Sequence, residues 1–205
     1  IPIGVGAAFG DKLKNKKNLT TIFIGDGAVE TGVFHESINF AALHSLPILF
    51  ICENNNYSVN TTLSERQPKN RKIVDLVRGH GLDSYFEDGQ DVVKVFNLVK
   101  KNVEKIKKYQ KPVFLEFQTY RWLEHCGPNN DDELNYRPKG EFESWLKRDP
   151  LKLISSKLLD QNIIDNEALK FFEKEIKSDF DEAVNFAKSS PFPKKSELYK
   201  HVFPV

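Results

Sequence analysis

Short, continuously apolar runs divide the first part of the chain at regular intervals. They occupy positions 20–24 (TTIFI), 47–52 (PILFIC) and 112–119 (PVFLEFQT), and each is rich in β-branched or aromatic residues. Continuous apolar character, rather than an alternation of apolar and polar residues, is typical of strands that are covered on both faces. The pattern therefore predicts three strands of a parallel sheet.

Helical patterns lie between these runs. Positions 31–45 carry Phe34, Ile38, Ala41 and Ala42 at helical spacing, and positions 92–109 carry a similar apolar stripe. Residues 1–9 also indicate a helix, with no capping residue ahead of it. Strands that alternate with helices predict an α/β fold with a mostly parallel sheet and helices on both faces. Such folds bind ligands at the carboxyl ends of the strands.

The character of the chain changes after position 119. Residues 120–140 are rich in Asn, Asp, Pro and Gly and lack periodicity, which predicts a long loop, and long loops in compact domains are usually functional. We therefore predict an α/β core over 1–119, incomplete at its N-terminus, an active-site loop over 120–140, and a helical region over 141–205. The tail aromatics Phe192, Tyr199 and Phe203 are expected to dock on a partner.

Composition narrows the classes of partner. Thirty basic and 29 acidic residues leave a net charge of +1, and no apolar run approaches the roughly 20 residues that span a bilayer. We therefore expect neither a nucleic acid nor a membrane as partner, and a cytoplasmic or organelle-matrix location.

The chain has no methionine, which indicates a processed product or part of a longer protein. A disulfide between Cys52 and Cys126 is not expected, because Cys52 lies in an apolar strand.

Two turns after consecutive predicted strands carry candidate chemistry. Gly25-Asp26-Gly27 follows the first strand and precedes a helix, so the amides of Gly27 and Ala28 would face an anion. The next strand ends at an Asn pair, and Asn55 offers a neutral oxygen, with the carbonyl of Tyr57 close behind. Oxygen ligands of this kind suit Mg²⁺ or Ca²⁺ bound to a diphosphate. The alternative is that both segments are ordinary turns, since Gly, Asp and Asn are common turn residues.

The two turns together resemble a known signature. GDGAVETGVFHESINFAALHSLPILFICENNNYSV is similar to the thiamine diphosphate motif of the alpha chain in the decarboxylating component of 2-oxo acid and acetoin dehydrogenases. The segments IPIGVGAAFG, FEDGQDVVKV, KPVFLEFQTYR, LKRDPLKLI and EAVNFAKSSPFPKKSELY are also similar to this family. The resemblance implies a thiamine-diphosphate-binding fold that lacks the N-terminal part of its domain.

The resemblance also implies roles for individual positions. Asp26, the side chain of Asn55 and the main-chain carbonyl of Tyr57 would ligate Mg²⁺. The diphosphate would be held by the backbone of the first turn, at Gly25, Gly27 and Ala28. In the later loop, Arg121 would lie at the base of the cofactor site. His125 would act as the catalytic histidine, near the diphosphate and the reacting carbon.

Other titratable residues receive structural interpretations. His35 and His44 are expected on helix faces, and His80 and His201 carry no functional signal. Glu30 lies in the first turn after the Gly-Asp-Gly motif, where the helix dipole favours a carboxylate whatever the function.

The later loop departs from the family pattern. Leu123 replaces a histidine, and Cys126 replaces the serine that some members use for regulatory phosphorylation, so kinase control is not expected. In the family, the aminopyrimidine is contacted by a segment upstream of Ile1, and the activating glutamate comes from a beta-type chain or a second domain. The implied partners are therefore a beta-type subunit in an α2β2 assembly and a lipoyl-bearing acyltransferase.

The expected function is oxidative decarboxylation of a 2-oxo acid, or cleavage of acetoin, with acyl transfer to a lipoyl group. Two alternatives remain at this point. A transketolase-like or non-oxidative carboligase shares the same metal turn, and a non-catalytic subunit would act only in assembly.

Overall fold

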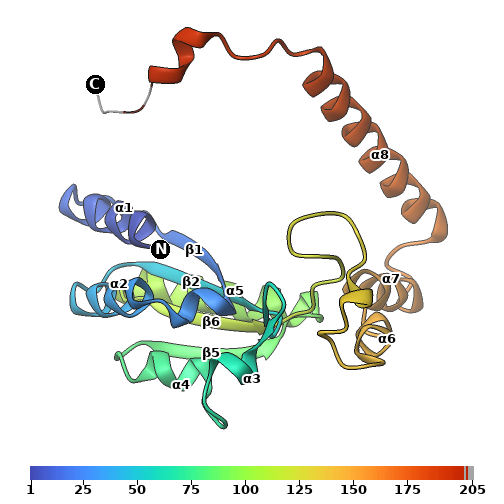
Figure 1. The fold of residues 1–205 in the computed structure, drawn as a ribbon. Helices are drawn as coiled ribbons and strands as arrows, with labels where there is room; N and C mark the ends of the chain where they lie inside the picture. Colours follow the sequence, from blue (N-terminus) through green and yellow to red (C-terminus); the bar gives the residue numbers. More distant parts are fainter. Residues whose placement is uncertain (201, 203–205) are drawn as a thin grey trace. The chain divides into compact units, whose positions relative to one another are not determined.

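The computed structural model describes residues 1–200 and 202, so Phe203 and His201 lie outside the described residues. The chain divides into two compact units, Ile1–Ile154 and Ser155–Val205. The first unit contains the sheet and all of the predicted site residues (Figure 1). The function assigned to each of the three predicted parts of the chain stays a prediction.

A four-stranded parallel sheet forms the centre of the first unit. Its strand order is β1 (Thr20–Gly25), β2 (Ile48–Asn54), β6 (Val113–Gln118) and β5 (Asp83–Asp88). The three predicted apolar runs are β1, β2 and β6, which confirms the parallel sheet. Strand β5 was not predicted, because its sequence DSYFED is mostly polar and it lies at an edge of the sheet.

Helices cover both faces of this sheet, as predicted (Figure 1). On one face, α1 (Pro2–Leu13), α2 (Gly32–Leu43) and α4 (Ile73–Arg78) bury their apolar side chains against β1, β2 and β6. On the other face, α5 (Val92–Tyr109) packs through the fully buried Ile106. The fully buried Phe34, Phe50 and Phe114 join α2 to the sheet. This packing fixes the strand ends that carry the candidate site.

The remaining elements of the first unit surround the carboxyl edge of the sheet. A short antiparallel hairpin, β3 and β4, follows β2 and leads into the single-turn helix α3. Within the predicted loop 120–140 the structure has one 3-10 turn, η2. The bounds of these and the later elements are β3 Tyr57–Ser58, β4 Thr61–Thr62, α3 Leu63–Arg66, η1 Asp26–Glu30, η2 Asp132–Leu134, α6 Glu141–Leu146 and α7 Pro150–Asp160.

The second unit is built around one long helix. Asp165 is the N-cap of helix α8 (Asn166–Ser189), because its carboxylate accepts a hydrogen bond from the amide of Ala168. The 3-10 turn η3 (Lys195–Tyr199) follows this helix. One side of α8 carries exposed apolar residues, including Phe172 and Phe180. Docking of the tail aromatics on a partner stays a prediction.

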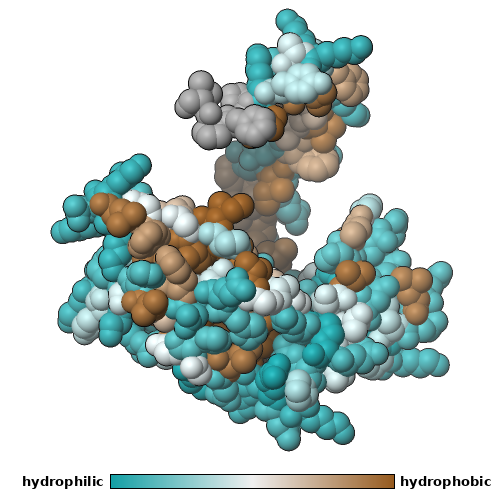
Figure 2. Space-filling model, turned by 60° about the vertical axis from the view of Figure 1, so that its left-hand side comes forward, coloured by the Kyte–Doolittle hydropathy of each residue, from teal (hydrophilic) through white to brown (hydrophobic). Residues whose placement is uncertain are grey.

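Apolar side chains are also exposed on the first unit. Figure 2 shows them on the side formed by α1 and α2, where Ile3, Leu13 and Leu43 are exposed. Across residues 1–200 and 202, no helix has the length and apolar character needed to span a membrane. Both cysteines are free, with Cys52 buried in β2 and Cys126 exposed.

Candidate metal centre

The carboxyl ends of β1 and β2 lie side by side and bring the two predicted oxygen donors together. Gly25 of β1 pairs in parallel register with Glu53 of β2. Asp26 directly follows β1, and Asn55 directly follows the last residue of β2, Asn54, so both leave the sheet at its carboxyl edge. Asp26 is almost completely buried, and the backbone of Asn55 lies close enough to its carboxyl group to lower the pKa. The predicted proximity of Asp26 and Asn55 therefore holds, while their role as metal ligands stays a prediction.

Two successive Asx turns, in which an asparagine side-chain oxygen accepts the backbone amide two residues later, shape the segment at the end of β2. The Asn54 Oδ1 accepts the Asn56 amide at 3.0 Å, and the Asn55 Oδ1 accepts the Tyr57 amide at 3.0 Å. Asn56 adopts a left-handed conformation with φ of 68°, which Asn tolerates better than most residues. An amide oxygen has two lone pairs, so the Asn55 Oδ1 keeps one for a cation.

The Gly-Asp-Gly turn continues into a short 3-10 turn rather than directly into a long helix. This turn, η1, contains Gly27 and Ala28, and α2 begins only at Gly32. A Cβ atom at Gly27 would lie 2.7 Å from the Ser58 Oγ, so a side chain at this position would collide with the β3 strand. Glycine therefore allows the turn to approach β3 closely. The first amides of such a turn have no partner within it and are available to an anion.

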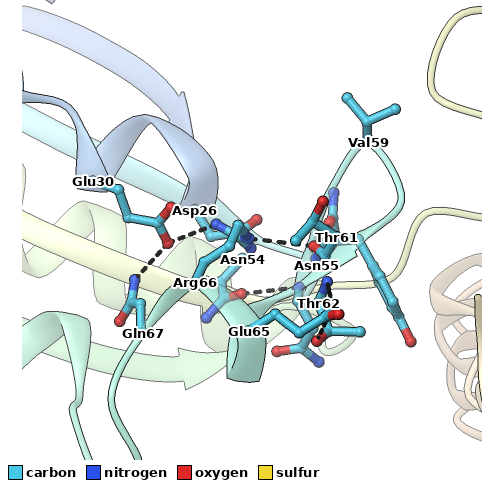
Figure 3. Close-up of polar contacts among 12 residues, drawn as sticks. Asp26, Glu30, Asn54, Asn55, Val59, Thr61, Thr62, Glu65, Arg66 and Gln67 are labelled. Atoms are coloured by element: carbon cyan, nitrogen blue, oxygen red, sulfur yellow. Dashed lines mark hydrogen bonds and ion pairs between the residues drawn. The ribbon is translucent and has the colours of Figure 1, made fainter.

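Arg66 is a further member of this centre that the sequence analysis did not identify. Its guanidinium forms an ion pair with Asp26 through Nη2 and with Glu30 through Nη1, the latter at 2.7 Å (Figure 3). Gln67 Nε2 donates to the same Glu30 carboxylate at 3.1 Å. Glu30, which the sequence analysis attributed to the helix dipole, is thus tied to α3. No sequence pattern marks Arg66, because 40 residues separate it from Asp26.

Burial dominates the electrostatics of Asp26. Desolvation raises the pKa of its carboxyl group above the ordinary value, and the Arg66 guanidinium and the Asn55 amide partly offset this effect. A nearby divalent cation would favour the ionised carboxylate in the same way. The site is therefore arranged so that positive charge stabilises Asp26.

The donor set fits a hard divalent cation. It offers one carboxylate, one amide oxygen and one main-chain carbonyl, and Mg²⁺ prefers such oxygen ligands. Within the part of the chain that the structure describes, no cluster of three or more His, Cys, Asp or Glu side chains could hold a metal. A cation at the β1–β2 edge would therefore depend on the Asn55 amide and the Tyr57 carbonyl as well as on Asp26.

Arg121 connects the 120–140 loop to the hairpin of β3 and β4, which follows Asn55. Its Nη2 donates to the Val59 carbonyl at 2.9 Å and to the Tyr136 hydroxyl at 2.7 Å, and it lies 3.4 Å from the buried Asp131. The Nη1 of Arg121 is buried without a protein partner. The structure thus brings Arg121 to the segment that carries Tyr57, while its contact with a cofactor stays a prediction.

His125 is placed differently from the other predicted residues. It lies in an exposed turn of the same loop, and among the described residues no hydrogen bond or ion pair joins its side chain to Asp26, Asn55 or Tyr57. The structure therefore does not bring His125 into the polar network of the metal centre, and its catalytic role stays a prediction.

A second arginine of this loop, Arg137, lies between Asp131 and the ring of Tyr57. Arg137 is nearly buried and forms an ion pair with Asp131 at 2.9 Å, and its guanidinium lies 6.0 Å from the centre of the Tyr57 ring. The Tyr57 hydroxyl donates to the Glu141 carboxylate at 2.6 Å. Burial and the Glu141 carboxylate both raise the pKa of Tyr57, so its hydroxyl stays protonated. Arg137 and Glu141 were not predicted, because Arg137 lies in the loop without periodicity and Glu141 begins a helical segment in which no local pattern marks a contact with Tyr57.

Comparison with known proteins identifies the family of the chain. The family model described as "Dehydrogenase E1 component" matches residues 1–196. The pyruvate dehydrogenase E1 component subunit alpha of Rickettsia felis is 36% identical over 203 residues, which cover 99% of this chain and 61% of the relative. The subunits of the same name from Porphyra purpurea and Rhizobium meliloti are 33% and 32% identical and are covered over 60% and 57% of their lengths. This chain thus spans about three fifths of the length of these relatives, and it belongs to the dehydrogenase E1 component family.

Proposed function

We propose that this chain carries the metal and diphosphate half of a thiamine diphosphate site, in the alpha-type part of a 2-oxo acid or acetoin dehydrogenase. The observation that carries the proposal is the convergence of Asp26, Asn55 and Tyr57 at one edge of the sheet. Asp26, the Asn55 Oδ1 and the Tyr57 carbonyl would hold Mg²⁺. The backbone of Gly25, Gly27 and Ala28 would hold the diphosphate.

Thiamine diphosphate, when bound, supplies the electron sink for decarboxylation of a 2-oxo acid. The residues of this chain would anchor and orient it. Arg121 is fixed by hydrogen bonds to the Val59 carbonyl and the Tyr136 hydroxyl, so it would present a positive charge beside the β3–β4 hairpin that contains Tyr57. His125, in its exposed turn, would stabilise negative charge or move a proton at the entrance to the site.

The proposal includes partners that this chain does not contain. A beta-type subunit in an α2β2 assembly would supply the activating glutamate, and a lipoyl-bearing acyltransferase would accept the acyl group. A cytoplasmic or organelle-matrix location is part of the same proposal. The relatives named as pyruvate dehydrogenase subunits support a dehydrogenase over the transketolase-like and non-catalytic alternatives.

Calorimetry on the complete assembly tests the proposal. Asp26→Asn removes the only carboxylate of the proposed ligand set, so binding of thiamine diphosphate in the presence of Mg²⁺ should weaken by at least about 100-fold. Asp88→Asn is the matched control. Asp88 also stands at the carboxyl end of a strand, but that strand, β5, is separated from β2 by β6. Undiminished binding by the Asp26→Asn assembly would reject the proposed metal centre.

A further inference from the structure

Glu116 is a buried carboxylate that none of the proposed roles uses. It lies in β6 and is 4% exposed. In the parallel register Cys52 pairs with Glu116 and Asn54 with Gln118, so the side chains of Asn54 and Glu116 face the same side of neighbouring strands. An unpaired buried carboxylate costs several kcal/mol. Glu116 must therefore be held by specific hydrogen-bond donors.

The donors to Glu116 fix the orientation of a neighbouring amide. Asn54 Nδ2 donates to the Glu116 Oε1 at 2.8 Å, and the backbone of Val74 lies close enough to lower the pKa of the same carboxyl group. An ionised carboxylate only accepts hydrogen bonds, so it requires the NH₂ group of Asn54 to face it. The Asn54 Oδ1 then points the other way. Because Asn54 is also buried, water does not compete for its amide.

That orientation determines the turn of the metal centre. The Asn54 Oδ1 accepts the Asn56 amide at 3.0 Å, which closes the turn directly before Tyr57. The main-chain carbonyl of Asn54 is also engaged, because it accepts hydrogen bonds from the Thr119 amide at 2.8 Å and from the Gln118 side chain at 3.1 Å. Every polar group of the Asn54 side chain is thus engaged, and rotation of its amide would break two hydrogen bonds at once.

We propose that Glu116 is a positioning residue of the metal centre, which acts through Asn54 to set the turn that presents the Asn55 oxygen and the Tyr57 carbonyl to a divalent cation. This inference rests on the proposed function. Partners that orient metal ligands without touching the metal typically contribute about 10-fold to 100-fold in affinity. Loss of Glu116 should therefore weaken cation binding without removing any ligand.

The test uses Mn²⁺ as a probe of the cation site. Mn²⁺ is titrated into the complete assembly with saturating thiamine diphosphate, and the free ion is followed by electron paramagnetic resonance. Glu116→Leu keeps the approximate volume but removes both acceptors, so the Kd for Mn²⁺ should rise by at least about 10-fold. Glu116→Gln keeps one acceptor oxygen, so its Kd should fall between those of the wild type and Glu116→Leu.

A matched control separates positioning from general destabilisation. The Ser84 Oγ donates to the Val74 carbonyl at 2.6 Å, so Ser84→Ala removes a buried hydrogen bond at Val74, a close neighbour of Glu116. Ser84→Ala should lower the thermal midpoint and leave the Kd for Mn²⁺ unchanged. The inference is overturned if Glu116→Leu binds Mn²⁺ as tightly as the wild type, or if Ser84→Ala weakens binding equally.

Three further outcomes are informative. If Glu116→Leu does not fold, wild-type affinity in Glu116→Gln overturns the inference by itself. If the wild-type assembly binds no Mn²⁺ in the presence of thiamine diphosphate, the proposed function fails. Binding by the wild type with unchanged affinity in every Glu116 variant overturns only the positioning role.

Discussion

The ion pair between Arg66 and Asp26 gives a stability prediction with a defined pH dependence. The side chain of Asp26 is 1% exposed and that of Arg66 is 10% exposed, so the pair is buried. Removing one partner of a buried pair leaves an uncompensated charge and typically costs about 3–5 kcal/mol. We expect Arg66→Met to lower the free energy of unfolding by about 3 kcal/mol at pH 7 in EDTA, at the lower end of that range.

The effect should appear as a shift of the thermal midpoint. A change of about 3 kcal/mol lowers the midpoint by roughly 6–12 °C in a protein of this size, measured by circular dichroism or calorimetry. Arg71→Met is the matched control, because Arg71 is exposed and lies in the segment after α3. Substitution at this surface position should change the free energy of unfolding by less than about 0.5 kcal/mol.

The sign of the pH dependence follows from Asp26. Its pKa in the folded protein is raised above the ordinary value. The contribution of Asp26 to the free energy of unfolding is therefore largest at low pH, where the carboxyl group is protonated, and falls as the pH rises through the folded-state pKa. Arg66 lowers this pKa, and its removal should raise the pKa further. The difference between Arg66→Met and wild type should therefore be full near neutral pH and should shrink as Asp26 becomes protonated in acid. A difference that stays constant with pH, or is absent at pH 7, would show that the Arg66–Asp26 ion pair does not stabilise the folded protein.

Three further predictions concern neighbouring parts of the first unit. Gly27→Ala should weaken thiamine diphosphate binding by at least about 10-fold in calorimetry, because its Cβ would lie 2.7 Å from the Ser58 Oγ, and Ser58→Gly in the same protein should restore part of the affinity. Alkylation followed by mass spectrometry should label the exposed Cys126 and spare Cys52 in the folded protein, since burial raises the pKa of the Cys52 thiol; equal labelling would contradict the burial of β2. Asp131→Asn should speed proteolysis within the 120–140 loop, because Asp131 holds two arginines there, and an unchanged cleavage rate would show that these pairs do not order the loop.

The sequence predicted the sheet where apolar character was continuous. Strands β1, β2 and β6 and helix α5 matched their apolar patterns, because burial on both faces of a strand, or on one stripe of a helix, selects those patterns. Strand β5 was missed, because an edge strand is covered less completely and its sequence DSYFED is mostly polar. The hairpin of β3 and β4 was missed because two-residue strands carry no periodicity.

The candidate site was predicted only as far as the strand ends. Asp26 and Asn55 could be paired from sequence, since parallel strands end at one edge and turn residues mark those ends. Arg66 and Glu116 could not, because an arginine in a short polar segment and a glutamate within an apolar run have no distinguishing local pattern. Their roles depend on long-range contacts, with Asp26 for Arg66 and with Asn54 for Glu116.

The position of the bound metal tests the proposed metal centre most directly. A crystal structure of the complete assembly with thiamine diphosphate and Mn²⁺ would locate the ion by its anomalous scattering. We expect a peak in each site at about the ligand distance of a small divalent cation from the Asp26 carboxylate, the Asn55 Oδ1 and the Tyr57 carbonyl. A cofactor-bound peak held by other residues, with Asp26 still paired only to Arg66, would contradict the proposed metal centre.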